Sequence, residues 1–249
     1  MSDVVLFVFE GAKTETQIFD NLKTHYFSGC QNTVIKATFC THIYTLWDKV
    51  KSDKFLDLLE IIREQHEENR KVLKDVSRED VSQIFLFFDY DGHVKEASDD
   101  AIQEMLAYFS DETETGKLYI SYPMVEAIKH LKVGIDFKNT VVDAKNKIKC
   151  KNTGHNYKQL VDRSTSYQNL TALKMNDWNY VILENIKKAN LIVNNLYEPP
   201  GYNKIISEMN QRQIFTHQLQ KYINHRSIVA VLSAFPFFII EYFGEKAIK

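Results

Sequence analysis

The stretch VVLFVFEG at residues 4–11 decides the fold, together with IFLFFDYDG at residues 84–92. Each is a run of apolar and aromatic residues that stops at a carboxylate, and such runs predict parallel strands buried on both faces. In open α/β sheets, ligands bind beyond the carboxyl ends of the strands. If the two strands are neighbours, Glu10, Asp89 and Asp91 converge at one edge. Three carboxylates repel one another unless a cation lies between them, and oxygen ligands favour Mg²⁺ or Mn²⁺.

The first half of the chain alternates between strand and helix patterns. A helix is predicted from Thr14, a candidate N-cap, with Ile18, Leu22 and Tyr26 on one face. Further strands are predicted near 34–41 and 117–121, and further helical stretches at about 44–73, 99–109 and 124–131. This alternation predicts an α/β fold, in which helices flank a mostly parallel sheet with right-handed crossovers.

The pattern changes after about residue 135. From Trp178 to Leu196 the apolar residues recur at helical spacing, and further helices are predicted at about 204–224 and from Ser227. We therefore expect two parts. Residues 1–135 form the α/β domain, with a helical insertion at about 44–80, and residues 136–249 form a basic, mainly helical subdomain. The apolar C-terminal helices suggest a homodimer.

Composition favours a globular protein of the cytoplasm. The chain has 249 residues, 44% of them hydrophobic, and only three cysteines, which lie far apart. The N-terminus does not have the pattern of a signal peptide. The longest apolar stretch, residues 228–240, is too short to span a bilayer, so we expect a buried core helix and no membrane association.

Charge is divided unevenly along the chain. Residues 1–130 contain 24 acidic and 14 basic residues, whereas residues 131–249 contain 9 acidic and 17 basic residues. Basic residues able to contact phosphates concentrate in one segment of the second half: Lys145, Lys147, Lys149, Lys151, Lys158 and Arg163. Such residues give largely sequence-independent affinity for nucleic acid. The alternative interpretation is a solvated basic loop.

Two further motifs accompany the strand ends. The first, EGAKTE at residues 10–15, puts a glycine after the strand and Glu15 in the first turn of a helix, where the helix dipole tolerates an anion. The second, SYPMVE at residues 121–126, follows the last predicted strand and places Glu126 at the same sheet edge. Together with Asp89-x-Asp91, these motifs resemble the Toprim domain of topoisomerases, primases and OLD-family nucleases. The form of the first motif is most similar to RloB-like stand-alone Toprim proteins.

The resemblance covers about residues 1–131 and implies a divalent-metal-dependent nuclease of DNA or RNA, possibly tRNA. It implies metal ligands at Glu10, Glu15, Asp89 and Asp91 for two Mg²⁺ or Mn²⁺ ions, with Glu10 also acting as general acid or base. Glu126 and Lys129 would be catalytic, although an ordinary helix pair at spacing i, i+3 is the alternative. Some Toprim effectors act in anti-phage defence with an ATPase. This chain has no P-loop motif, so we expect a separate ATPase partner.

Two other functions remain open from the sequence. A catalytically silent Toprim-like module could act as a scaffold or bind nucleic acid. A haloacid-dehalogenase-like phosphatase could use Asp89 as nucleophile, because that family also has Asp-x-Asp-Gly after an apolar strand. That motif normally follows the first strand, however, and the later motifs of the family are not convincing here.

Overall fold

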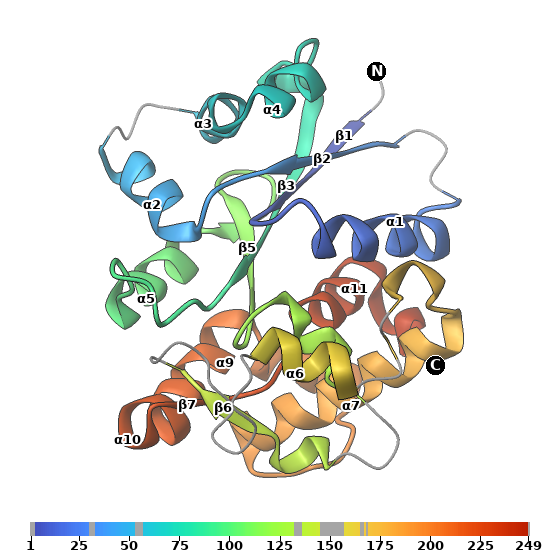
Figure 1. The fold of residues 1–249 in the computed structure, drawn as a ribbon. Coiled ribbons are helices and arrows are strands. Elements are labelled where there is room, and N and C mark those ends of the chain that lie inside the picture. The colour runs from blue at the N-terminus through green and yellow to red at the C-terminus, as the bar shows by residue number, and fades with distance from the viewer. Residues whose placement is uncertain are drawn as a thin grey trace.

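A mostly parallel sheet forms the centre of the molecule (Figure 1). The computed structural model describes residues 3–29, 33–52, 57–131, 136–144, 157–164, 167 and 169–248, with the backbone alone at 34–37, 39 and 162–164. Within these residues the strand order is β2-β1-β3-β5-β4, and only the short edge strand β4 is antiparallel. The strands are β1 (Asp3–Phe9), β2 (Thr33–Phe39), β3 (Val81–Asp89), β4 (Ser110–Asp111) and β5 (Gly116–Ser121).

The strands that precede the acidic motifs are adjacent in the sheet and end level with one another. Phe9 of β1 pairs with Phe87 of β3, and Asp89 pairs with Ser121 of β5. Residues 4–9 of β1 are all buried, which is why this strand is apolar without alternation. The register therefore brings the residues that follow β1, β3 and β5 to one edge of the sheet.

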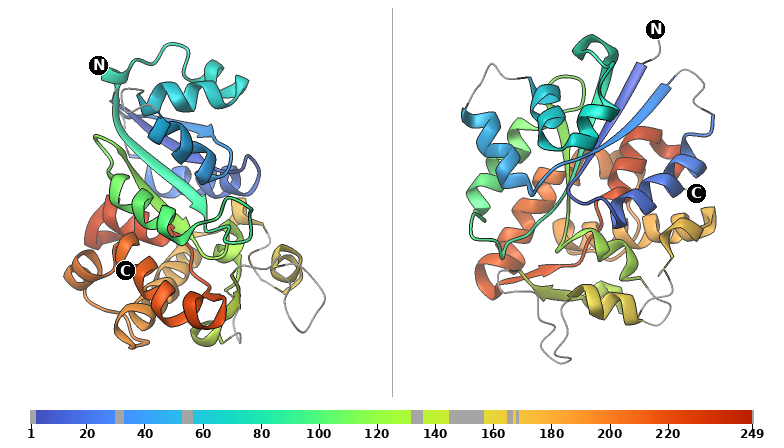
Figure 2. Two further views of the ribbon diagram at one scale, coloured as in Figure 1. Left: turned by 90° about the vertical axis from the view of Figure 1, so that its left-hand side faces the viewer. Right: turned by 45° about the horizontal axis from the view of Figure 1, so that its top comes forward.

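Helices cover both faces of the sheet (Figures 1 and 2). The helices are α1 (Thr14–Tyr26), α2 (Ile43–Ser52), α3 (Leu58–Gln65), α4 (Glu67–Val72), α5 (Asp99–Tyr108), α6 (Tyr157–Ser164), α7 (Met175–Asn194), α8 (Tyr202–Glu208), α9 (Gln211–Gln218), α10 (Asn224–Arg226) and α11 (Phe235–Phe243). Helices α1 and α11 lie on one face, and α2, α3 and α5 lie on the other. The fold class predicted from the sequence, a mostly parallel α/β sheet flanked by helices with a helical C-terminal part, is confirmed.

Aromatic rings fill the interface between the sheet and helix α11. Phe238 of α11 lies with its ring centroid 5.2 Å from that of Phe7 and 4.9 Å from that of Phe85. Phe235 stacks on Phe87 at 4.7 Å. Because Phe7, Phe85 and Phe87 come from two neighbouring strands, the C-terminal helix completes the core of the N-terminal sheet. Aromatic pairs at such distances contribute about 0.5–1.5 kcal/mol each beyond their buried area.

The C-terminal part also extends the sheet edge through a second, two-stranded sheet. Strand β6 (Val141–Asp143) pairs antiparallel with β7 (Ile228–Ala230). Just beyond β7, Leu232 exchanges two backbone hydrogen bonds with Tyr122, which follows β5. This pairing holds the residues after β5 against the C-terminal part.

Several predicted helices are wrong in form or extent. The helix expected at 124–131 is a 3₁₀ turn, η2 (Val125–Lys129). The stretch 44–73 holds three helices, α2, α3 and α4, and residues 204–224 are divided among α8, α9 and a short π-helix, Leu219–Ile223. The expected helix from Ser227 begins instead as strand β7, because residues 228–230 pair with β6. Thr14 is the first helical residue of α1, and Lys13 occupies the N-cap position.

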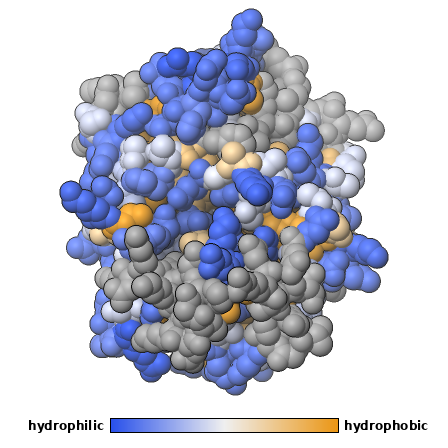
Figure 3. Space-filling model, viewed as in Figure 1, coloured by the Kyte–Doolittle hydropathy of each residue, from blue (hydrophilic) through white to orange (hydrophobic). Residues whose placement is uncertain are grey.

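Figure 3 shows one face on which hydrophilic residues predominate and the hydrophobic areas are small and separate. None of the helices in the described ranges has both the length and the apolar character needed to cross a membrane.

Candidate active site at the carboxyl ends of the strands

Backbone hydrogen bonds link the acidic residues that follow β1 and β3. The Asp89 N–H donates to Glu10 Oε2 at 3.1 Å, and the Val125 N–H donates to Asp89 Oδ1 at 2.8 Å. Glu10 is thus attached to the end of β3, and Asp89 is attached to the segment after β5. Both carboxylates are positioned by main-chain groups, and the strand-end prediction of their proximity is confirmed.

Glu15 folds back over Gly11 at the start of helix α1. The Gly11 N–H donates to Glu15 Oε1 at 2.9 Å. A Cβ at position 11 would lie 2.9 Å from both carboxylate oxygens of Glu15, so a larger residue there would force the Glu15 side chain to shift. Glu15 itself is 6% exposed. The sequence Glu-Gly followed by a helix therefore places two carboxylates, Glu10 and Glu15, on either side of one tight turn.

Glu126 reaches the same region from η2. It is 1% exposed, and its Oε1 accepts a hydrogen bond from the Thr14 hydroxyl at 3.3 Å. The Lys158 ammonium on α6 lies 2.8 Å from the same oxygen. Thr14 and Lys158 are neighbours of Glu126 that no local motif predicted, because these residues lie far apart in the sequence.

The turn after β3 positions Asp91. Its φ of 44° is in the left-handed region, which Asp tolerates better than most residues. A Cβ on Gly92 would lie 2.6 Å from the Ala144 carbonyl oxygen and 2.5 Å from a ring carbon of Tyr90, so glycine is required there. His93 follows, with its Nδ1 3.7 Å from Asp91 Oδ1. The Asp-x-Asp-Gly sequence is thus explained by a tight turn that packs against residue 144.

Burial and mutual repulsion make these acids difficult to ionise together. Desolvation by burial is the main cause that raises the pKa of Glu10 to about 8, and the charge of Asp91 adds to it. Burial, followed by the charges of Glu10 and Asp91, raises the pKa of Asp89 well above its ordinary value. Burial also raises the pKa of Glu15, whereas the Lys158 charge lowers it.

The donor atoms suit a hard divalent cation, although they do not yet surround one. Five carboxyl groups converge, and carboxylate oxygens are the preferred ligands of Mg²⁺ and Mn²⁺. A cation would also offset the repulsion that contributes, after burial, to the raised pKa values of Glu10, Glu15 and Asp89. In the described part of the chain, however, no three Asp, Glu, His or Cys side chains are arranged so that they could hold a metal ion as they stand.

Of the remaining predicted site residues, some lie near the acids and others are outside the described residues. Lys129 is 8% exposed on η2, three residues after Glu126. Lys158 faces Glu126 and so lies at the carboxylates. Arg163 belongs to α6, but its side chain is outside the described residues, and so are all of Lys145, Lys147, Lys149 and Lys151. Their predicted contacts with phosphates stay a prediction.

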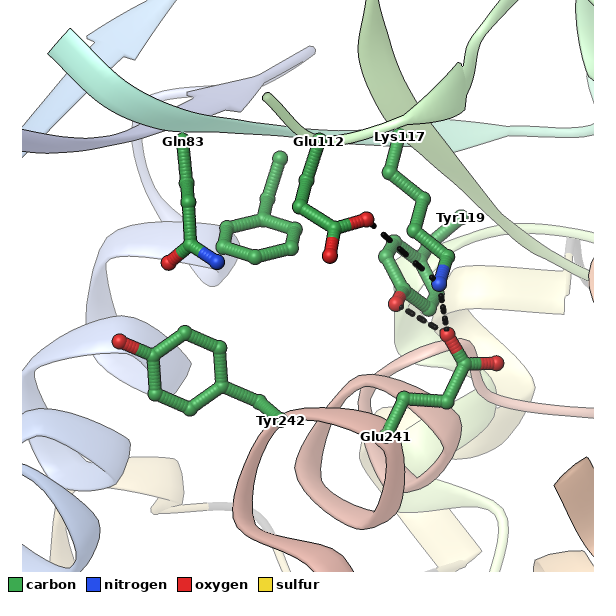
Figure 4. Close-up of a pocket in the computed structure, with 7 residues that line it drawn as sticks. Gln83, Glu112, Lys117, Tyr119, Glu241 and Tyr242 are labelled. Atoms are coloured by element: carbon green, nitrogen blue, oxygen red, sulfur yellow. Dashed lines mark hydrogen bonds and ion pairs between the residues drawn. The ribbon is translucent and has the colours of Figure 1, made fainter. Parts of the chain in front are cut away.

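A polar cavity of about 350 Å³ lies near the opposite end of the strands, between β3, β5 and α11 (Figure 4). Lys117 is its central cation, with its Nζ 2.6 Å from Glu241 Oε2 and 3.8 Å from Glu112 Oε2. The Tyr119 hydroxyl donates to the same Glu241 oxygen at 2.7 Å. Because these charges already satisfy one another, we interpret the cluster as a structural tie between the sheet and α11.

Comparison with protein-family models, curated proteins and solved structures finds no match to this chain. The Toprim resemblance therefore rests on the three motifs, and it stays a prediction.

Proposed function

We propose that this protein is a divalent-metal-dependent nuclease that hydrolyses phosphodiester bonds of DNA or RNA. The observation that carries the proposal is the convergence of acidic side chains from three strand ends, at the edge where α/β sheets bind their ligands. These acids are Glu10, Glu15, Asp89, Asp91 and Glu126. The raised pKa values of Glu10, Glu15 and Asp89 indicate buried acids whose negative charge is compensated only in part, and a metal ion would supply the missing positive charge.

Four of these residues have the donor atoms to hold the metal: Glu10, Glu15, Asp89 and Asp91. A bound divalent ion would generate the hydrolytic nucleophile and stabilise charge on the phosphoryl group. In the ion-free protein Glu10 has a pKa of about 8, which is a suitable value for accepting and releasing a proton near neutral pH. Glu126 and Lys129 are assigned a supporting role at the phosphoryl group.

The biological setting is also part of this proposal. An anti-phage effector that cleaves RNA, such as tRNA, and acts in the cytoplasm with a separate ATPase agrees with the motifs and with the absence of a P-loop sequence. The proposed assembly also includes a homodimer, with an interface elsewhere than on the apolar residues 235–240 of α11, which are buried within the chain.

The test is cleavage by the purified full chain. Plasmid, single-stranded DNA and total tRNA are incubated with Mg²⁺ or Mn²⁺ and, separately, with EDTA. We expect metal-dependent cleavage that Glu10→Gln and Asp89→Asn each abolish. Glu96→Gln is the matched control, because Glu96 is exposed in the loop that follows the Asp-x-Asp motif. It should cleave like the wild type.

Two results would favour other functions. Intact nucleic-acid binding without cleavage or metal binding would favour a scaffold. Hydrolysis of a small phosphate ester that survives Glu10→Gln and is lost in Asp89→Asn would favour a phosphatase with Asp89 as nucleophile.

A further inference from the structure

Helix α6 places the ammonium group of Lys158 next to the acids at the strand ends. The helix packs against η2 through Tyr157, which is fully buried and hydrogen-bonded to His130 Nδ1 at 3.1 Å. Val161, one turn later on the same face, is also fully buried. These two residues fix the start of α6, and Lys158, next to Tyr157, is thereby directed to Glu126.

The contact between Lys158 and Glu126 joins an accessible cation to an inaccessible anion. The Lys158 side chain is 59% exposed, whereas the Glu126 side chain is 2% exposed. Their charged atoms are 2.8 Å apart. The Lys158 charge also lowers the pKa of Glu15, so its field acts on a second acid of the site. Lys158 can therefore leave toward solvent without a rearrangement of the core, but Glu126 cannot.

An ammonium group compensates this site only in part. It carries one positive charge and binds as a hydrogen-bond donor, whereas a divalent cation carries two charges and takes six or more oxygen ligands. Glu10 and Asp89, two other acids of the site, have raised pKa values. The negative charge of the site is thus neutralised only in part. The Glu126 oxygen that Lys158 contacts is occupied by this ion pair.

We propose that Lys158 is a displaceable counter-ion of the site. It compensates Glu126 and Glu15 in the ion-free protein. A divalent cation held by Glu10, Glu15, Asp89 and Asp91 takes the Glu126 oxygen as a further ligand and so displaces Lys158, and the released ammonium then contacts a phosphate of the substrate. This inference rests on the proposed function. It adds a description of how the charge of the acids is balanced before the metal and substrate bind.

The first test is metal binding by the full chain after treatment with a chelator, measured by calorimetry with Mn²⁺. We expect Lys158→Gln to bind Mn²⁺ about tenfold more tightly than wild type, the effect of removing one competing hydrogen bond between charged groups. Lys158→Arg keeps the charge and should retain wild-type affinity. Lys71→Gln removes an exposed lysine that pairs with Glu68 on α4 and should change nothing.

The second test is binding of a fluorescent single-stranded oligonucleotide, with Ca²⁺ as a metal expected not to support cleavage. Lys158→Gln should bind it more weakly than wild type in Ca²⁺ and equally in EDTA, because the ammonium is available to phosphate only after the metal displaces it. Equal affinity in Ca²⁺ would overturn the phosphate contact. Thermal unfolding of each variant verifies that it is folded.

The outcomes separate the two proposals. If wild type binds Mn²⁺ and Lys158→Gln binds it no more tightly, displacement is wrong and the metal site stands. If neither protein binds Mn²⁺, the proposed metal-dependent function fails, and displacement fails with it.

Discussion

Replacing Glu10 by Gln should stabilise the ion-free protein at pH 8 while it abolishes cleavage. The carboxyl group of Glu10 has a pKa of about 8 in the folded protein, against an ordinary value of 4.5. The folded state therefore keeps a proton that the unfolded state releases as the pH rises between these values. Stability must fall over this interval by about 1.4 kcal/mol per pH unit for one proton, and level off above pH 8.

The difference between the ordinary pKa of 4.5 and the folded value of about 8 means that Glu10 destabilises the folded protein at pH 8 by at most on the order of 5 kcal/mol. We expect about 2 kcal/mol of added stability in Glu10→Gln, because Asp89 and Asp91 remain and still repel each other. Gln keeps a side-chain oxygen that can accept the Asp89 N–H. Near pH 5 the wild-type carboxyl is protonated, so the two proteins should be almost equally stable.

The assay is urea unfolding in EDTA at several pH values, followed by the fluorescence of the buried Trp47 and Trp178. The exposed control Glu96→Gln should follow the wild type at every pH. Adding Mg²⁺ should stabilise the wild type more at pH 8 than at pH 6, with a smaller gain for Glu10→Gln. The reasoning is refuted if Glu10→Gln is less stable than wild type at pH 8, or if the difference does not depend on pH.

Two further substitutions test ties that hold the C-terminal part. Lys188→Met should lower the free energy of unfolding by about 3 kcal/mol. The buried Lys188 side chain donates to three backbone carbonyls, including those of Phe137 and Thr140, and these would lose their partner. A loss below about 1 kcal/mol in urea unfolding would contradict this. Asn21→Ala should cost about 2–3 kcal/mol, because the Asn21 side chain accepts from the Trp178 indole at 2.6 Å and donates to two carbonyls near η4 (Leu170–Ala172). An unchanged stability together with an unchanged Trp178 emission maximum in this variant would contradict the hydrogen bond between the indole and Asn21.

The strands could be predicted from the sequence because their signal is local. A run such as residues 84–88 is apolar at every position, since a central parallel strand is buried on both faces. The strand-end rule then predicts that Glu10 and Asp89 lie together, and the register of β1 with β3 brings this about. These parts of the fold and site need no information about distant segments.

The remainder depends on pairing between distant residues. Residues 228–230 are apolar enough for a helix, but they form β7 because β6, more than eighty residues earlier, offers a partner. The contact of Thr14 with Glu126 likewise joins residues 112 positions apart. A single sequence records neither pairing, since each local pattern is compatible with more than one neighbour.

The packing beneath the acids explains how the fold tolerates them. Phe9 directly precedes Glu10, Phe87 lies two residues before Asp89, and their ring centroids are 5.6 Å apart. Phe87 also stacks on Phe235 of α11. This aromatic layer excludes water from below the carboxyl groups, so the packing that stabilises the strands also desolvates Glu10 and Asp89. A more polar layer would lower their pKa values, and it would also weaken the core that sets their positions. Fixed, desolvated carboxylates are therefore a consequence of how these strands are buried.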